Sequence, residues 1–195
     1  EAAWKAHNPE PLGDIGTTET LQVVPLVDWY AAADHLMTDI GVAYLLVTDQ
    51  RTILFDTGNN TDRRDPAPLV HNMDILGIDL EEIDDIVISH AHYDHVGGRQ
   101  WTGGKITGST FGIGNDQPDL ADKRIFVPTD MTYPGSDPTV LRDPVRLADG
   151  VATTGTIPRR LFIGWIDEQA LAIDVAGKGI VLVVGCGHQT LTRLI

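Results

Sequence analysis

The chain has 195 residues, of which 42% are hydrophobic and 22% are charged, a composition typical of a soluble globular protein with one buried core. Its 28 acidic and 14 basic residues give a formal net charge of −14, which argues against nucleic acid or an anionic membrane surface as the main partner. No apolar run reaches the roughly 18 residues of a membrane-spanning helix. The one cysteine, Cys186, excludes an internal disulfide framework.

We therefore expect a single soluble domain over residues 1–195, located in the cytoplasm. Because the numbering begins at Glu1 rather than at a methionine, export with a removed leader stays open as an alternative.

The first part of the chain predicts an irregular arm followed by three strands. Residues 1–19 are polar and rich in turn-forming residues, so we expect an N-terminal arm there. Residues 21–27, 41–48 and 51–58 are apolar or β-branched runs bounded by Asp, Gln and Gly, which predicts strands. The second and third of these strands are close enough in sequence to form a hairpin.

A helix is predicted within residues 68–83, where apolar positions recur at helical spacing. The residues that share one face of this helix are Leu69, Met73, Leu76 and Leu80. A turn ends the helix, and "DIVISH" then predicts a buried strand that has His90 at its C-terminal end.

Residues 100–150 are rich in Gly, Pro and Asp, so we expect a long connection with two short strands, near 105–107 and 124–127. Two further strands are predicted at 171–175 and 179–184, because these apolar runs flank "AGKG", a favourable hairpin turn.

The end of the chain predicts a helix that begins after His188. This helix has an apolar face, lacks a C-cap and stops at Ile195. We therefore expect that a C-terminal segment is missing.

The stretch "VISHAHYDHVGG" indicates a metal site. It places His90, His92, Asp94 and His95 within six positions, and imidazoles and carboxylates are ligands of zinc, iron and manganese. On an extended segment His90 and His92 can point to the same side. Asp94 and His95 follow at a turn, where they can serve a second, adjacent site.

This motif resembles the His-x-His-x-Asp-His signature of the metallo-β-lactamase superfamily, whose members are mostly metal-dependent hydrolases. The resemblance implies an α/β fold, the four-layer αββα sandwich, here lacking its C-terminal part. "ILFDTG" is similar to the superfamily strand that ends in Asp-x-Gly, which implies that Asp56 holds a ligand histidine in the required tautomer. "VVGCGH" is similar to the strand before the next ligand, which implies that His188 joins His90 and His92 at the first metal.

Cys186, two positions before His188, is expected to be a small buried residue packed behind the ligand strand. The superfamily's later histidine and bridging aspartate, which complete a second metal site, do not follow "GCGH" in this sequence. A site with one metal, a site completed by another chain and an inactive fragment therefore all stay open.

Three further stretches, "LGIDLEEIDDIVISHAHYDHVGG", "TTGTIPR" and "GKGIVLVVGCGHQT", resemble the branch of this superfamily that includes the archaeal dihydropterin methyl ribofuranosyl-aminobenzene phosphate synthase. Within "TTGTIPR", Arg159 is a candidate to bind an anionic group of a substrate, and a solvated arginine at a turn is the alternative.

The resemblance implies a hydrolase that uses a metal-activated water on an ester, lactone, amide or phosphate bond of a small molecule. A metal ion lowers the pKa of bound water from about 15.7 to about 7, and with one metal Asp94 can orient or deprotonate that water. We expect one or two zinc ions, with iron or manganese as alternatives. A mononuclear iron oxygenase, a pterin-related transferase and an inactive truncated metal-binding remnant also remain open, as does a homo-oligomer.

Overall fold

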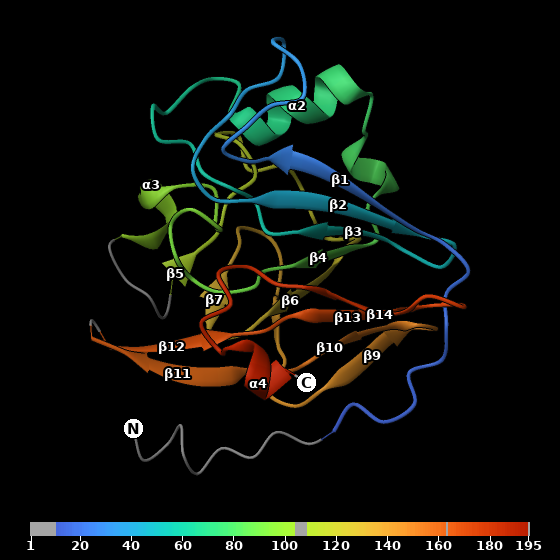
Figure 1. The fold of residues 1–195 in the computed structure, drawn as a ribbon. Helices are drawn as coiled ribbons and strands as arrows, with labels where there is room; N and C mark the ends of the chain where they lie inside the picture. The colour runs from blue at the N-terminus through green and yellow to red at the C-terminus, as the bar shows by residue number, and fades with distance from the viewer. Residues whose placement is uncertain (1–10, 104–108, 163, 195) are drawn as a thin grey trace.

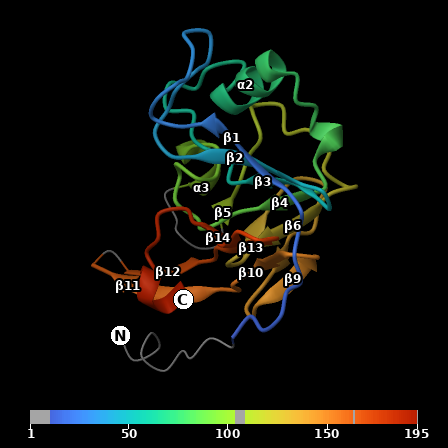
Figure 2. The same ribbon diagram turned by 45° about the vertical axis from the view of Figure 1, so that its right-hand side comes forward.

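The computed structural model describes residues 11–103, 109–162 and 164–194. Two β-sheets face each other, and helix α2 (Pro68–Leu76) covers the outer face of the first sheet (Figure 1). The sheets remain separate layers when the molecule is turned by 45° (Figure 2). This is the α/β sandwich that the sequence predicts.

The first sheet is mixed and has the order β1-β2-β3-β4-β6-β8. Its strands are β1 (Leu21–Val27), β2 (Ala43–Thr48), β3 (Thr52–Phe55), β4 (Asp85–Val87), β6 (Arg124–Val127) and β8 (Thr139–Val140). The hairpin of β2 and β3 is antiparallel as predicted, whereas β3, β4, β6 and β8 are parallel neighbours.

The second sheet is antiparallel and has the order β14-β13-β10-β9. Its strands are β9 (Val145–Ala148), β10 (Val151–Thr153), β13 (Leu171–Val175) and β14 (Gly179–Val183). Two smaller sheets pair β11 (Ile157–Leu161) with β12 (Gly164–Glu168) and β5 (Ser109–Thr110) with β7 (Met131–Thr132). The short helices are a 3₁₀ turn (Leu80–Glu82), α3 (Arg99–Thr102) and α4 (Leu191–Leu194), which lies beside β11 and β12 (Figures 1 and 2).

Alternate side chains of the first sheet pack into two different cores. Leu45 and Leu54 belong to the core under α2, whereas Leu46 and Ile53 belong to the core between the two sheets. Both faces of these central strands are buried, which explains why their sequences are continuous apolar runs.

The predicted helix is present, but not all of the residues predicted on its apolar face are buried. Leu69 and Met73 are buried, while Leu76, which the sequence pattern places on the same face, is 41% exposed. The helix ends there, because Gly77 adopts a left-handed C-cap conformation with φ 66°. The strand predicted at 105–107 lies outside the described residues.

The segment from residue 11 to residue 18 is irregular, as predicted for the N-terminal arm, and it is attached to the second sheet. Ile15 packs against Ala152 and Ala172. The Thr18 amide donates to the Asp174 carbonyl at 2.9 Å. These contacts cover part of the sheet face that points away from the first sheet.

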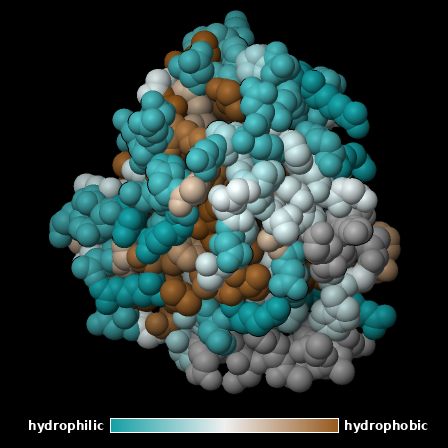
Figure 3. All heavy atoms as spheres, turned by 180° about the vertical axis from the view of Figure 1, so that it is seen from behind, coloured by the Kyte–Doolittle hydropathy of each residue, from teal (hydrophilic) through white to brown (hydrophobic). Residues whose placement is uncertain are grey.

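No helix among the described residues is long and apolar enough to cross a membrane. Seen from behind, hydrophilic residues form most of the visible surface, with hydrophobic residues showing between them (Figure 3).

Strand ends from both sheets meet at one edge of the sandwich. Because β3 and β4 are parallel and Phe55 pairs with Val87, their C-terminal ends bring Asp56 beside Ser89. Because β13 and β14 are antiparallel, the residues before β13 lie next to those after β14. An isolated β-bridge between His90 and Glu168 joins the strand ends of the first sheet to those of the second.

Candidate metal centre

Three histidines converge at the edge where the two sheets meet. His90 and His92 follow β4, and His188 follows β14. The ring centroids lie 4.7 Å apart for His90 and His92, 4.9 Å for His90 and His188, and 5.0 Å for His92 and His188. The structure thus brings together the three residues that the resemblance assigns to the first metal.

Neighbouring groups hold the Nδ1 atoms of two of these rings. Nδ1 of His90 is 2.8 Å from the Ser89 hydroxyl, and Nδ1 of His188 is 2.8 Å from Oε2 of Glu168. Each ring is therefore oriented with its Nε2 atom available as a ligand. Nε2 of His90 lies 3.0 Å from Nδ1 of His92, so the two nitrogens point at a common position.

The electrostatic environment keeps two of the rings neutral. Burial, followed by the nearby imidazoles of His95, His92 and His188, holds the pKa of His90 well below its usual value. Burial and the His188 ring also lower the pKa of His92. Neutral imidazole is the form that binds a metal ion, so the trio suits a divalent cation.

Asp56 contacts the second half of the motif, and its role in holding a ligand histidine remains a prediction. Its carboxylate is fully buried and accepts hydrogen bonds from the Ser89 amide at 2.6 Å and the Ser89 hydroxyl at 2.7 Å. Its Oδ2 atom also lies 2.7 Å from Nδ1 of His95. Asp56 adopts φ 60°, a conformation uncommon for a residue with a side chain.

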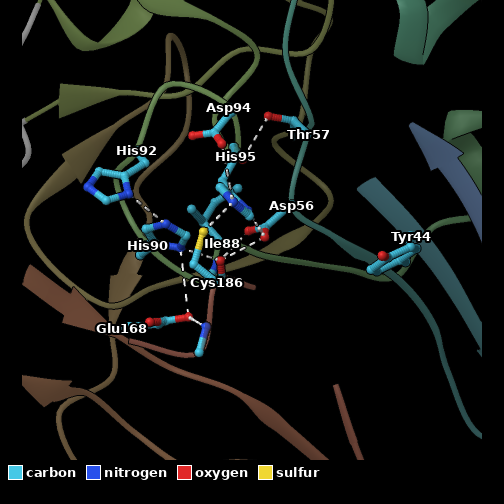
Figure 4. A network of polar contacts seen from close by, with 12 residues as sticks. Tyr44, Asp56, Thr57, Ile88, His90, His92, Asp94, His95, Glu168 and Cys186 are labelled. Atoms are coloured by element: carbon cyan, nitrogen blue, oxygen red, sulfur yellow. Dashed lines mark hydrogen bonds and ion pairs between the residues drawn. The ribbon is translucent and has the colours of Figure 1, made fainter. Parts of the chain in front are cut away.

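Asp56 and His95 keep a proton between them. Burial raises the pKa of Asp56, against the opposing effects of His95 and Ser89. Burial also disfavours the charged form of His95, but the charge and the hydrogen bond of Asp56 outweigh it and raise the pKa of His95 to about 10. With this proton on Nδ1 of His95, its Nε2 atom faces the site (Figure 4).

The prediction that Cys186 is buried behind the ligand strand is wrong. Its side chain is exposed rather than packed behind the strand, and Sγ lies 3.2 Å from Nε2 of His95. The physical reason is that β14 ends at Val183, so Cys186 lies in the turn before His188 and not in the sheet.

Within the part of the chain that the structure describes, residues that could hold a metal form two groups, in each of which the ligand atoms lie within 4.8 Å of one another. One contains His90, His92, Cys186 and His188, and the other contains Asp94, His95 and Cys186. Two roughly 2.0–2.1 Å bonds at a tetrahedral zinc ion place nitrogens slightly more than 3 Å apart, which the 3.0 Å separation between His90 and His92 approaches. The donor types and spacing therefore fit a divalent metal.

Two residues of the site were missed by sequence reasoning. The buried carboxylate of Glu168 accepts hydrogen bonds from the Gly187 amide at 2.9 Å and the His188 amide at 2.7 Å, besides its contact with the His188 ring. Ser89 links Asp56 to His90. The one signal for Glu168 was an acidic residue just before a buried strand, a pattern that is common in proteins without a metal site.

Gly185 allows the segment after β14 to lie close to the segment after β4. A Cβ atom there would overlap the Ser89 hydroxyl and lie 3.1 Å from Nδ1 of His90.

Arg159, the predicted substrate-binding residue, lies on β11 opposite Ile166 of β12, the strand that ends at Glu168. Its role remains a prediction.

Comparisons with known proteins agree with this arrangement. Residues 36–102 match the family model described as the metallo-beta-lactamase superfamily. This range contains Asp56 and the motif from His90 to His95, and it ends before Cys186 and His188.

Two curated proteins are similar in sequence. The 7,8-dihydropterin-6-methyl-4-(beta-D-ribofuranosyl)-aminobenzene-5'-phosphate synthase of Methanocaldococcus jannaschii is 26% identical over 229 aligned residues, which cover 94% of this chain and 74% of that protein. The beta-lactamase-like protein 2 homolog of Drosophila melanogaster is 37% identical over 93 residues, which cover 45% of this chain and 30% of that protein.

Two solved structures are similar to this chain. One, from a study of indirect contributions of mutations to a new enzyme function, has a TM-score of 0.50 at 19% identity. The match covers 87% of this chain and 75% of that chain. A quorum-quenching N-acyl homoserine lactone lactonase has a TM-score of 0.46 at 19% identity, with coverage of 85% and 72%.

Proposed function

We propose that the chain is a metal-dependent hydrolase of the metallo-β-lactamase superfamily, acting on an ester, lactone, amide or phosphate bond of a small molecule. The observation that supports this proposal is the convergence of His90, His92 and His188 with the Nδ1 atoms of two of them held by Ser89 and Glu168. Imidazoles held in this way are the ligands of a catalytic metal that keeps an open position.

The chain's own residues have distinct roles in this proposal. A divalent ion held by the three histidines supplies Lewis acidity and lowers the pKa of bound water. Asp94 is the proposed proton acceptor, because its side chain is 24% exposed and lies at the site, with Oδ2 3.9 Å from Nε2 of His95. Asp56 and Glu168 are positioning residues that act through His95 and His188.

A cavity of about 250 Å³ at the motif turn is a candidate for part of the substrate site. Its lining includes Asn59, Asn60, Tyr93 and Arg99, and Tyr93 lies between His92 and Asp94 in the sequence. The Arg99 guanidinium stacks over the Tyr93 ring at 3.9 Å. Arg99 offers a cation to an anionic group of the substrate, and Arg159 on β11 remains a separate candidate for that role.

The first test is elemental analysis of the purified chain together with a panel of ester, lactone, amide and phosphate substrates. We expect one or two zinc ions per chain and hydrolysis of at least one bond class that stops when a chelator is added. His92→Ala should lower metal affinity by more than about tenfold, since partners of the ligands alone contribute 10- to 100-fold. His35→Gln, which changes an exposed histidine outside the site, is the matched control.

Other results would contradict the proposal. Tight metal binding without hydrolysis of any bond class would favour the metal-binding remnant. Bound iron with oxygen consumption would favour the mononuclear oxygenase.

A transferase reaction is the second candidate. It is favoured by the similarity to the M. jannaschii synthase, which extends over 94% of this chain. Incubation with pterin and aminobenzene phosphate compounds, followed by mass spectrometry, separates the two candidates. A transferase yields a joined product, whereas a hydrolase yields only fragments.

A further inference from the structure

We propose that a groove beside the C-terminal end of α2 binds a basic peptide segment of a partner protein. An apolar side chain of that segment enters one part of the groove, and its cations lie beside the other part. The groove consists of two neighbouring cavities, of about 510 Å³ and about 640 Å³, whose linings share Asp79 and Leu80. Neither lining contains a residue of the metal centre, so the inference goes beyond the proposed hydrolysis.

The first cavity offers a hydrophobic surface to a ligand. Its lining comes from α2, the 3₁₀ turn and the segment after β5, and it includes Val70, Met73, Ile78, Leu80 and Ile113. Met73 and Ile113 are buried, whereas the other three are half-buried. Half-buried apolar side chains around an open cavity gain from further burial, so an apolar side chain of a ligand is favoured there.

The second cavity is negatively charged. Its lining contains four exposed acidic residues, Asp79, Glu81, Asp119 and Asp122. Among the described residues of this lining Lys123 is the one cation, and its Nζ atom donates to Asp122 at 2.9 Å and to the Glu81 carbonyl at 3.2 Å. The ammonium group is thus paired with one carboxylate, and the remaining excess of negative charge favours a cationic ligand.

The succession of the two cavities favours a peptide segment over a small molecule. Each cavity alone has the volume of a whole small-molecule site, which is about 300–1,000 Å³. A ligand that occupies both presents an apolar group next to cationic groups, as a leucine followed by lysines or arginines does. A second copy of this chain is a poorer occupant, because its net charge of −14 is repelled by the carboxylates.

The groove and the metal centre lie at opposite ends of β4. The 3₁₀ turn leads into the start of β4 at Asp85, and Lys123 directly precedes β6, the parallel neighbour of β4. His90 and His92 follow the other end of β4, and α2 covers the outer face of the same sheet (Figure 1). A peptide in the groove therefore leaves the histidines accessible, and its affinity should be the same with and without a bound metal.

Fluorescence anisotropy with labelled peptides tests the inference. The probe is a short peptide in which leucines are followed by lysines, and the matched peptides replace the leucines by glycines or the lysines by glutamates. We expect the leucine–lysine peptide to bind at least about tenfold more tightly than either matched peptide, because apolar burial and charge pairing both contribute. Added salt should weaken its binding, since exposed charges are screened.

Charge variants locate the binding in the groove. Asp79→Asn, Glu81→Gln and Asp119→Asn, combined in one chain, should weaken the leucine–lysine peptide by about tenfold. Asparagine can still cap the 3₁₀ turn, as Asp79 does by accepting from the Glu81 amide. The control chain loses three exposed carboxylates outside the two linings, through Glu19→Gln, Asp130→Asn and Asp143→Asn.

Val70→Gln tests the apolar part of the groove. It places an amide in the lining of the first cavity and should weaken the leucine–lysine peptide by about fivefold or more. Ile75→Gln is the matched control, because Ile75 is 45% exposed on the same helix and lies outside that lining. Circular dichroism of all variants checks that the fold is retained.

Three results would overturn the inference. The first is the absence of binding by the leucine–lysine peptide. The second is equal weakening by the two sets of charge variants, or equal binding of the leucine and glycine peptides, which would mean that the overall charge attracts the peptide. The third is a dimer in sedimentation velocity that Val70→Gln abolishes and Ile75→Gln retains, which would assign the groove to a second copy. None of these results depends on a bound metal, so the proposed hydrolysis is tested separately.

Discussion

At the scale of single residues, His90 has the most demanding environment in the site. It is fully buried, it contacts Ser89 and His92, and it is surrounded by other imidazoles. A charged His90 would be poorly solvated and repelled by its neighbours, so folding keeps it neutral. In the metal-free protein, keeping His90 neutral lowers the free energy of unfolding by an amount that depends on pH.

The stability of the metal-free protein should therefore fall in mild acid. A histidine in the unfolded chain takes up a proton with a pKa of about 6.5, whereas the folded protein holds the pKa of His90 well below that value. Below this pH the unfolded state binds the extra proton, and the free energy of unfolding decreases by up to about 1.4 kcal/mol per pH unit. His95, whose pKa is raised to about 10, has the opposite effect: the stability it contributes is fully present below about pH 6.5 and is lost as the pH rises above that value.

Urea unfolding in the presence of a chelator, from about pH 7.5 to about pH 5.5, measures this effect. His90→Asn removes the group, so the stability of wild type relative to this variant should fall as the pH decreases below about 6.5, with the effect of His95 cancelling in the difference. A constant difference in free energy of unfolding between wild type and His90→Asn across this range would show that His90 is not held neutral.

At the scale of elements, the end of β12 determines the position of the third ligand. Glu168 binds the amides of Gly187 and His188 and the ring of His188, so one carboxylate fixes the turn that follows β14. The contact depends on the antiparallel pairing of β13 with β14, which places the residues before one strand beside those after the other.

Glu168→Gln should lower metal affinity by about 10- to 100-fold, because the amide group offers one acceptor oxygen and turns a donor toward another donor. Competition with a chromophoric chelator measures the dissociation constant. Glu82→Gln, an exposed change in the 3₁₀ turn, is the control. Equal affinities for wild type and Glu168→Gln would show that the turn holds its shape without the carboxylate.

The elements that the sequence predicts are those with long apolar runs. β1, β13 and β14 match the predicted strands closely, and β4 and α2 occur where they are expected. Short strands such as β7 and β8 have two residues each, too few for a hydrophobic period to be recognised. The β13–β14 hairpin was predicted, but no local pattern marks the Glu168 carboxylate as the partner of His188.

In the candidate site, too, residues with a clear sequence signal were identified and residues without one were not. His90, His92, Asp94 and His95 were identified because they lie together in the sequence, and Asp56 and His188 through resemblance. Cys186 was misjudged, because its exposure depends on where β14 ends. Ser89 was missed, because a serine beside a histidine has no distinctive pattern.

At the scale of the whole molecule, the proposed metal ligands come from both sheets. His90 and His92 follow a strand of the first sheet, and His188 follows a strand of the second. A bound ion therefore links the two layers and stabilises their packing, since the unfolded chain does not hold these residues together.

Thermal unfolding with and without metal tests this link. Binding at a concentration 100-fold above the dissociation constant adds about 2.7 kcal/mol to the free energy of unfolding. We expect zinc to raise the melting temperature of wild type and of His35→Gln, and to leave that of His92→Ala nearly unchanged. An equal shift in all three would indicate nonspecific binding, which the net charge of −14 can promote.

The contact between Cys186 and His95 joins residues 91 positions apart. During synthesis on the ribosome, the motif around His90 emerges long before the turn that carries Cys186 and His188. The early part of the chain therefore cannot capture a metal ion in the complete site, and metal loading must follow docking of the second sheet. In a cell, the abundance of loaded protein should thus depend on metal supply after translation rather than during it.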